Sequence, residues 1–209
     1  MEPSIYKPSI YKGAGIYKAG AEGGISYPNL YKEQIKDNEY TIVQIGNKYY
    51  TVEPLREHFP NIQETIDITR PYSIEYVNNE YLGKYYNSLA VEEVQNWLKN
   101  NNYDWRVATK EDFEDLTTFN RGDLKAPLYW QDVNGITNKT FFSALPSGYM
   151  QNGTLRQYNT HALFITKSVD NGKYFYINIP TNNDTPPLVL NIYYDVLNAW
   201  PIRLVKDVI

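Results

Sequence analysis

The first 33 residues constrain the fold most, because prolines and glycines interrupt them too often for a helix or strand to extend. The interruptions fall at Pro3, Pro8, Gly13, Gly15, Gly20, Gly23, Gly24 and Pro28. Such a segment cannot fold alone, so the folded part of this 209-residue chain must lie C-terminal to it. The sequence therefore predicts an extended peptide over residues 1–33 and one domain over residues 34–209.

The same peptide carries a short repeat, Ile-Tyr-Lys three times and Leu-Tyr-Lys once. Its apolar and aromatic positions are Ile5, Tyr6, Ile10, Tyr11, Ile16, Tyr17, Leu30 and Tyr31. A disordered tail is usually poor in such residues, because apolar groups left in water lose free energy. We interpret the repeats as an anchor, in which each apolar pair fills a pocket on another protein and each lysine stays in water. The alternative is a leader that binds nothing.

Composition and charge exclude several classes of function. The absence of cysteine excludes disulfides, thiolate metal sites and cysteine nucleophiles. A net charge of −4 without a basic stripe argues against a nucleic-acid partner. No apolar run is long enough for a secretory signal or a membrane span, so a role outside the cell requires another carrier, such as release by a virus that lyses its host.

Tyrosine is the strongest compositional bias, with 21 copies. Tyrosine combines a large apolar face with a polar tip and loses little entropy when it is immobilised, so recognition surfaces favour it. The alternative is that a β-rich domain simply prefers aromatic residues in its strands. Both interpretations stay open.

Turn signals between apolar segments predict three hairpins. Gly46-Asn47 separates two β-branched or aromatic segments, 40–45 and 48–52. Gln151 to Thr154 and Asn171-Gly172 are the other two turns, with a buried strand over 161–166 between them. Later strands are expected over 189–194 and 202–205, after a proline-rich surface loop at 180–187.

Two helices are expected in the middle of the domain. The first follows Ser88 as N-cap and runs to about Lys99, since apolar residues recur at helical spacing there. The second begins after Thr109, with Asp112 in the position of a capping box. The acidic residues near its start suit the helix dipole and are expected on a solvated face; they are Glu111, Asp112, Glu114 and Asp115.

The order of motifs over residues 40–207 resembles the Fibrobacter succinogenes major paralogous domain. The segments that carry the resemblance are Ile45–Tyr50, Glu53–Leu55, Gly83–Asn87, Trp105–Phe113, Leu124–Ala126 with Trp130, Phe142–Tyr149 and Ile202–Asp207. Two features depart from that family: a cysteine before the Trp-Arg step is missing, and Leu163–Ser168 replaces a Trp-Ser-Ser run. The related formylglycine-generating enzymes depend on cysteines, so their activity is not carried over.

The resemblance implies an α+β fold, a C-type lectin-like domain of short antiparallel sheets with two helices and long loops on one side. In such domains loops bind while the framework holds them. The candidate ligand contacts are loop residues, Asn152, Tyr158, Asn182 and Asn183. The Trp-Arg and Phe-Ser-Ala-Leu-Pro segments are expected to be framework.

Catalytic chemistry is not indicated. His58 and His161 lack the spacing of metal ligands, and His161 is more typical of a core histidine than of a base. The runs at 170–172 and 182–184 lack the carboxylate series of a calcium loop. We expect no enzyme activity, no metal and no cofactor.

These features together favour a bacteriophage virion protein, a head or tail fibre subunit assembled in the bacterial cytoplasm. Its peptide would bind capsid or tail proteins, and its domain, as a trimer or dimer, would bind a host-surface glycan or protein with the help of multivalency. Neither nucleic acid nor membrane is an expected partner. The alternatives are a capsid decoration or cement protein without a ligand, and a bacterial surface adhesin.

Overall fold

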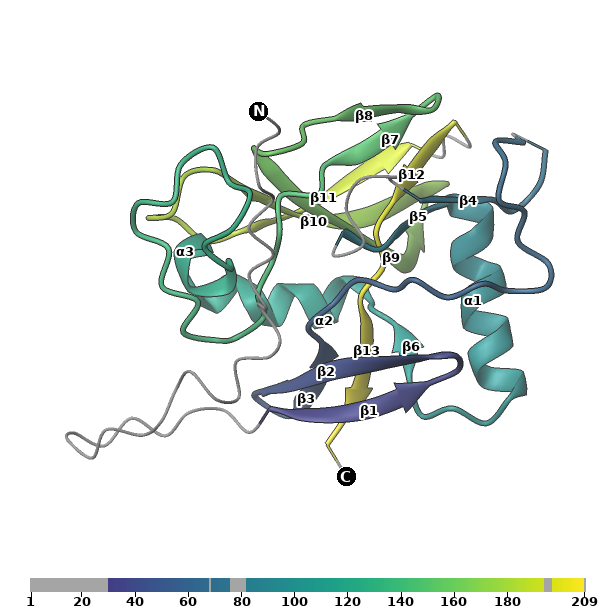
Figure 1. The fold of residues 1–209 in the computed structure, drawn as a ribbon, viewed down its shortest axis with the longest axis horizontal. Coiled ribbons are helices and arrows are strands. Elements are labelled where there is room, and N and C mark those ends of the chain that lie inside the picture. The colour runs from purple at the N-terminus through teal and green to yellow at the C-terminus, as the bar shows by residue number, and fades with distance from the viewer. Residues whose placement is uncertain (1–29, 68, 76–81, 194–196, 209) are drawn as a thin grey trace, which may run out of the picture.

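The computed structural model describes residues 30–67, 69–75, 82–193 and 197–208, and shows a mixed fold of short antiparallel sheets with few short helices (Figure 1). The α+β class predicted from the sequence is confirmed. The anchor positions Ile5, Tyr6, Ile10, Tyr11, Ile16 and Tyr17 lie outside the described residues.

One five-stranded sheet joins the beginning and the end of the described chain. Its order is β1-β2-β3-β13-β6, and every neighbouring pair is antiparallel. The strands are β1 (Tyr31–Ile35), β2 (Asn38–Ile45), β3 (Lys48–Thr51), β6 (Arg106–Val107) and β13 (Leu204–Asp207). The predicted turn at Gly46-Asn47 is confirmed, with Gly46 at a φ of 63° that glycine adopts without strain.

Two further antiparallel sheets lie on the other side of the molecule (Figure 1). The first has the order β11-β10-β9 and the second the order β4-β5-β12-β7-β8. Their strands are β4 (Ser73–Glu75), β5 (Lys84–Asn87), β7 (Tyr149–Gln151), β8 (Thr154–Arg156), β9 (His161–Asp170), β10 (Lys173–Pro180), β11 (Leu188–Tyr193) and β12 (Asn198–Trp200). The hairpins predicted at Asn152-Gly153 and Asn171-Gly172 are confirmed by the pairs β7–β8 and β9–β10.

Both predicted helices form, with one correction at a cap. α1 (Ser88–Asn100) buries Ala90, Val91, Val94 and Leu98. Its N-cap is Asn87 rather than Ser88, because the Asn87 amide oxygen accepts from the Ala90 N–H at 2.9 Å and also from the Tyr72 N–H at 3.1 Å. α2 (Lys110–Glu114) starts at the predicted capping box of Thr109 and Asp112. A 3₁₀ helix, η3 (Asp115–Thr118), and a single turn, α3 (Arg121–Leu124), follow it.

Two apolar clusters fill the space between the sheets and helices. The first packs α1 against Trp105 and Trp200, and the second packs α2 against Phe142 and Phe164. The Trp-Arg and Phe-Ser-Ala-Leu-Pro segments contribute buried side chains to these clusters, as expected of framework.

The structure corrects two predicted boundaries. β1 begins at Tyr31, so residues 31–33 belong to the first sheet and not to the anchor peptide, because Tyr31 pairs with Ile42 of β2. The last strand is β13, two residues later than predicted, since Ile202 forms only an isolated bridge with Ile165 before the chain joins β3 and β6.

Candidate functional site

Three segments that are far apart in the sequence meet at one end of the molecule, which we call the loop end. They are residues 120–143, which include α3, the turn 157–161 and the loop 180–187 (Figure 1, left). The Arg121 N–H donates to the Thr185 carbonyl at 3.0 Å, and the Thr181 hydroxyl donates to the Thr160 carbonyl at 3.0 Å. The loop end is therefore held by hydrogen bonds between its own segments.

Lys125 lies at the centre of the loop end and is fully buried. Its ammonium donates to the carbonyls of Pro180 at 2.6 Å and Thr181 at 2.9 Å, and to Asn183 Oδ1 at 2.5 Å. It lies 4.2 Å from the ring centroid of Trp130. These contacts use the three donors of the ammonium but leave its charge without a carboxylate partner among the described residues.

Arg121 is the second cation of the loop end and is only 8% exposed. Within the described part of the chain, its side chain forms neither an ion pair nor a hydrogen bond, and its Nε is buried. Buried charges are normally paired, because removing an ion from water is costly. Arg121 is the clearest exception to that rule in the described structure.

His161 adds a third titratable group. It is half-buried at the start of β9, pairs in register with Pro180, and has Nδ1 2.9 Å from the Thr160 hydroxyl oxygen. The sequence favoured a core histidine, whereas the structure places this side chain beside the two cations of the loop end.

The pKa values of these groups report an uncompensated positive charge. Burial, and then the charge of Arg121, lower the pKa of Lys125 to about 8. Burial, followed by the charges of Lys125 and Arg121, lowers the pKa of His161. Burial alone lowers the pKa of Arg121. The loop end thus holds positive charge under conditions that disfavour it.

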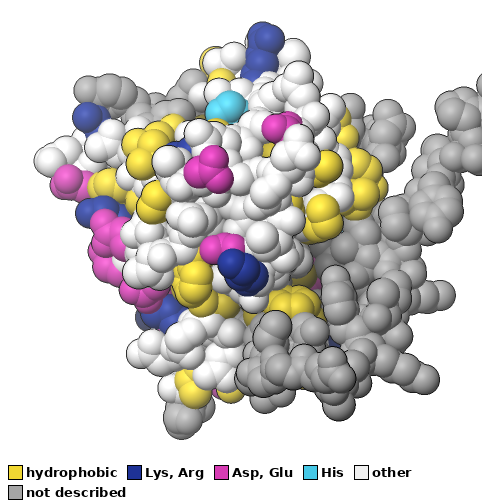
Figure 2. Space-filling model, turned by 90° about the vertical axis from the view of Figure 1, so that its left-hand side faces the viewer, with side chains coloured by type: hydrophobic (Ala, Val, Ile, Leu, Met, Phe, Trp, Pro, Cys, Tyr) yellow, Lys and Arg dark blue, Asp and Glu magenta, His cyan; other side chains and the backbone are white. Residues whose placement is uncertain are grey.

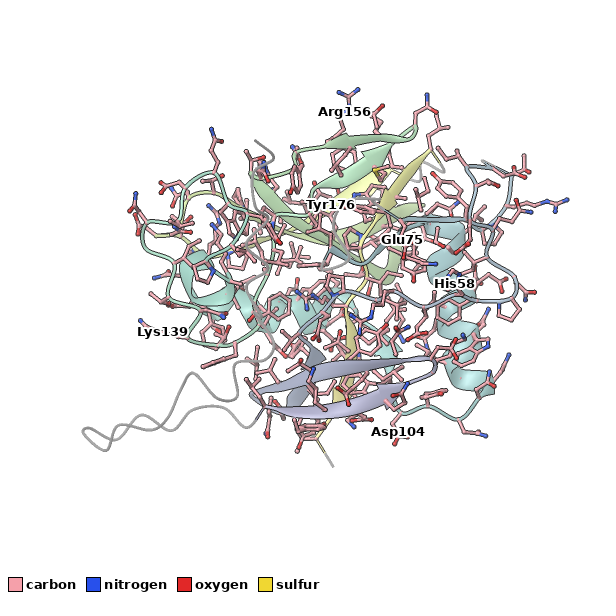
Figure 3. The ribbon with its side chains drawn as sticks, viewed as in Figure 1. His58, Glu75, Asp104, Lys139, Arg156 and Tyr176 are labelled. Carbon is pink, nitrogen blue, oxygen red and sulfur yellow. The ribbon has the colours of Figure 1, made fainter. Side chains whose placement is uncertain are left out.

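Figure 2 views the molecule from this end. Lysine and arginine side chains reach that surface at separate points, aspartate and glutamate side chains lie among them, and the rest of the described surface is uncharged. Lys139 is one of the exposed cations there, at 3.5 Å from Asp123 (Figure 3). The positive charge of Lys125 and Arg121 therefore lies beneath the surface and does not form a basic patch on it.

The structure brings three of the four predicted ligand contacts to the loop end. Tyr158, Asn182 and Asn183 all lie there, while Asn152 lies in the β7–β8 turn at another edge of the molecule (Figure 1). The Asn183 amide is already engaged on both sides, by Lys125 and by the Asn134 carbonyl, which is a framework role. Asn182 is exposed and uses its side-chain oxygen to cap the Asp184 N–H at 2.9 Å.

The two predicted anchor residues within the described chain differ in position. Leu30 is 43% exposed, whereas Tyr31 packs edge-on against Tyr49 at a centroid distance of 5.7 Å. Near Tyr31 in β1, Glu33 accepts from Trp105 Nε1 at 2.7 Å and from Lys206 Nζ at 2.6 Å. Tyr31 thus contributes to the sheet, which corrects its assignment to the anchor.

Other buried charges in the molecule have partners. Asp112 accepts from Arg106 Nη2 at 2.9 Å and from the capping N–H of Thr109 at 2.7 Å, and lies 2.9 Å from Lys48. Burial would raise its pKa, but these contacts outweigh burial and lower it to about 2. The prediction that Asp112 lies on a solvated face is therefore wrong, because Arg106 and Lys48 fold around it.

A second internal cluster joins Lys84 to Glu64 and His58. The buried Lys84 ammonium donates to Glu64 at 2.6 Å, and the hydrogen bond from Lys84 is the main cause that lowers the pKa of Glu64. The buried carboxylate of Glu57 likewise accepts from the Asn38 N–H at 3.1 Å and the Tyr40 hydroxyl at 3.0 Å. Glu64 thus neutralises Lys84, and the Glu57 carboxylate is held by neutral hydrogen-bond donors.

Among the residues that the structure describes, no three His, Cys, Asp or Glu side chains are grouped to hold a metal ion. In the same residues, no helix is long and apolar enough to cross a membrane. No family model, curated protein or solved structure matches the chain. The lectin-like resemblance and the virion assignment therefore remain predictions.

Sequence reasoning missed Arg121 and Lys125 as members of a site. Lys125 lies in one of the segments that carry the family resemblance, and Arg121 lies in none of them. The Lys125 ammonium and the Arg121 backbone N–H both donate to backbone carbonyls of the loop 180–187, and such contacts carry no signal in the sequence.

Proposed function

We propose that this protein is a non-enzymatic bacteriophage virion component, a head or tail fibre subunit whose lectin-like domain adheres to the host surface. The observation that supports adhesion best is the loop end, where three distant segments are joined around Lys125. A surface that is ordered before binding loses less entropy on binding, which favours recognition. Short antiparallel sheets with few short helices are compatible with the fold that the lectin-like resemblance implies.

The peptide before the domain would supply attachment to the particle. Its repeated apolar and tyrosine positions suit docking on capsid or tail proteins. In a trimer or dimer, several copies would bind a host glycan or protein at once, so that individually weak contacts give tight binding through multivalency. A cement protein would share the anchor but would not need a ligand surface.

Host-cell binding tests the adhesion proposal. Asn182→Trp places a bulky ring on the exposed loop end, and Asn96→Trp places the same ring on the exposed face of α1 as a matched control. We expect fluorescently labelled protein to bind host cells, Asn182→Trp to reduce that binding, and Asn96→Trp to leave it unchanged. Cells that bind none of the three proteins would contradict adhesion and favour cement.

Particle incorporation tests the anchor separately. A deletion of residues 1–29 spares β1, which starts at Tyr31, and so leaves the first sheet intact. We expect the shortened protein to be absent from purified particles. Incorporation at full occupancy would contradict the anchor.

A further inference from the structure

We propose that the loop end contains an oxyanion-binding site built on Arg121, with Lys125 supplying further positive charge. Its ligand is a carboxylate or phosphate group. The assignment of that group to an acidic host-surface glycan rests on the proposed adhesion function, while the oxyanion site itself does not.

The guanidinium of Arg121 is unused within the described structure. Arg121 is buried by the chain around it, yet none of the described residues accepts a hydrogen bond from its side chain. A planar guanidinium matches a carboxylate or phosphate with two parallel hydrogen bonds, and these are stronger than neutral ones. The Arg121 side chain is thus buried, but its guanidinium makes none of the paired hydrogen bonds to an oxyanion that it could make.

The charge around Arg121 is unbalanced. Arg121 is the first residue of α3 and Lys125 is its extended C-cap residue, and the charge of Arg121 is among the causes that lower the pKa of Lys125. The nearby carboxylate of Asp123 is already engaged, by the Thr137 hydroxyl at 2.6 Å and by Lys139 at 3.5 Å. Asp132 acts on Lys125 only through its charge, without an ion pair among the described residues. Among the described residues, therefore, neither Arg121 nor Lys125 forms an ion pair with a carboxylate.

The two cations have different roles. Lys125 already donates to three oxygens, so it adds positive potential but not a direct contact. Arg121 has donors to spare and is the residue that would contact the ligand. The lowered pKa values of Lys125 and His161 have cationic neighbours among their causes, and a bound anion would raise both.

The surroundings of the site suit a sugar that carries the anionic group. Exposed Asn182 offers an amide, and half-buried Tyr158 lies in the adjoining turn. Amide and tyrosine side chains are typical of adaptable polar recognition surfaces. We therefore expect an acidic sugar to bind more tightly than its neutral counterpart.

The test titrates the full chain with inorganic phosphate, glucuronate, glucose 6-phosphate and glucose at constant ionic strength in chloride. Binding is followed by calorimetry and by the NMR-measured pKa of the Lys125 amine. We expect the anions to bind, glucose not to bind, and the pKa of Lys125 to rise with ligand. Glucuronate and glucose 6-phosphate distinguish a carboxylate from a phosphate as the natural group.

Arg121→Gln is the test variant, and Arg156→Gln removes the same charge from an exposed position on β8 (Figure 3). Loss of a buried charged partner should weaken anion binding by at least about tenfold in Arg121→Gln. Arg121→Lys should retain part of the affinity, which separates a direct contact from a folding defect. Equal weakening by Arg156→Gln, or no binding by the unaltered chain, would overturn the site.

The two proposals fail in different ways. Anion binding without host-cell binding leaves the oxyanion site standing and removes its assignment to a host glycan. Host-cell binding by a chain that binds no anion leaves adhesion standing and removes the oxyanion site.

Discussion

Asp112 in α2 and Arg121 in α3 are both buried charges, but only one of them has partners in the described structure. Around Asp112, Arg106 and Lys48 converge on one carboxylate. The charged neighbour of Arg121 is Lys125, which is also a cation. The first arrangement is what a stable framework needs, and the second leaves a buried charge uncompensated, which we attribute to the proposed oxyanion site. Stability measurements should therefore respond in opposite directions at the two places.

The largest effect is expected at Asp112. Asp112→Ala leaves Arg106 and Lys48 without their carboxylate and removes the capping box, so it should lower the free energy of unfolding by about 4 kcal/mol. Denaturation in urea measures this change in the free energy of unfolding. Glu111→Ala is the control, since Glu111 is exposed on the same helix, and it should change stability by less than about 0.5 kcal/mol. A similar loss in both variants would contradict the framework role.

The next effect tests how firmly the loop end is held. A Cβ at Gly148 would lie 1.9 Å from the Arg156 carbonyl oxygen, and Gly148 has a φ of +60°. Gly148→Ala should cost about 3 kcal/mol, from overpacking and the left-handed backbone together. Gly172 has a similar φ of +74° in open space, so Gly172→Ala should cost only about 1 kcal/mol. Equal losses of stability in the two variants would mean that the turn 157–161 can shift to accommodate the added methyl group.

Acid titration separates the two buried charges by pH. The pKa of Asp112 is about 2 in the folded protein against 3.8 ordinarily, so its contribution of about 2 kcal/mol is present above pH 4 and is lost as the pH falls through 2. The stability difference between the unaltered chain and Asp112→Asn should shrink over that range. A difference independent of pH would contradict the lowered pKa.

Lys125 should show the same sign of pH dependence at higher pH, but for the opposite reason, because the folded protein disfavours its charged form. Its pKa is lowered to about 8 from 10.5, so the folded protein loses that proton first and gains stability relative to Lys125→Met as the pH rises from 8 to 10.5. Paired denaturation curves of the two proteins across this range check the direction. A declining difference would mean that the Lys125 charge is compensated.

The smallest effect is the most informative about the comparison. Arg121→Met keeps most of the length of the side chain and removes a desolvated charge, so it should raise stability by about 1 kcal/mol in buffer without phosphate. Arg156→Met is the exposed control and should lie within about 0.5 kcal/mol of the unaltered chain. Destabilisation by Arg121→Met would show that Arg121 has a partner in the folded chain.

The framework could be predicted where its signals are local. The turns at Gly46-Asn47 and Asn171-Gly172, and the capping box at Thr109, depend on residues within a few positions of each other. The boundary at Tyr31 could not be predicted in this way, because Leu-Tyr-Lys at residues 30–32 resembles the three earlier Ile-Tyr-Lys copies. Only the pairing of Tyr31 with Ile42 places it in the sheet.

The candidate site could be predicted only in part. Polar turn residues correctly indicated a surface at 180–187, but Asn183 is engaged by Lys125, which is 58 positions away in the sequence. Asp112 appeared solvated in a run of acids, yet Lys48 reaches it from β3. Such long-range contacts between charges, and between a lysine and backbone carbonyls, leave no periodic pattern in the sequence.

Glu33 has a mechanical consequence. It connects β1 to Trp105 and to Lys206 of β13, so the first strand is fastened to the last one across the sheet. Tension applied to the chain ahead of Tyr31 would load this joint as well as the β1–β2 ladder, and both must break before the hairpin peels away. A domain pulled by its leading peptide thus bears the force where its first and last strands are joined.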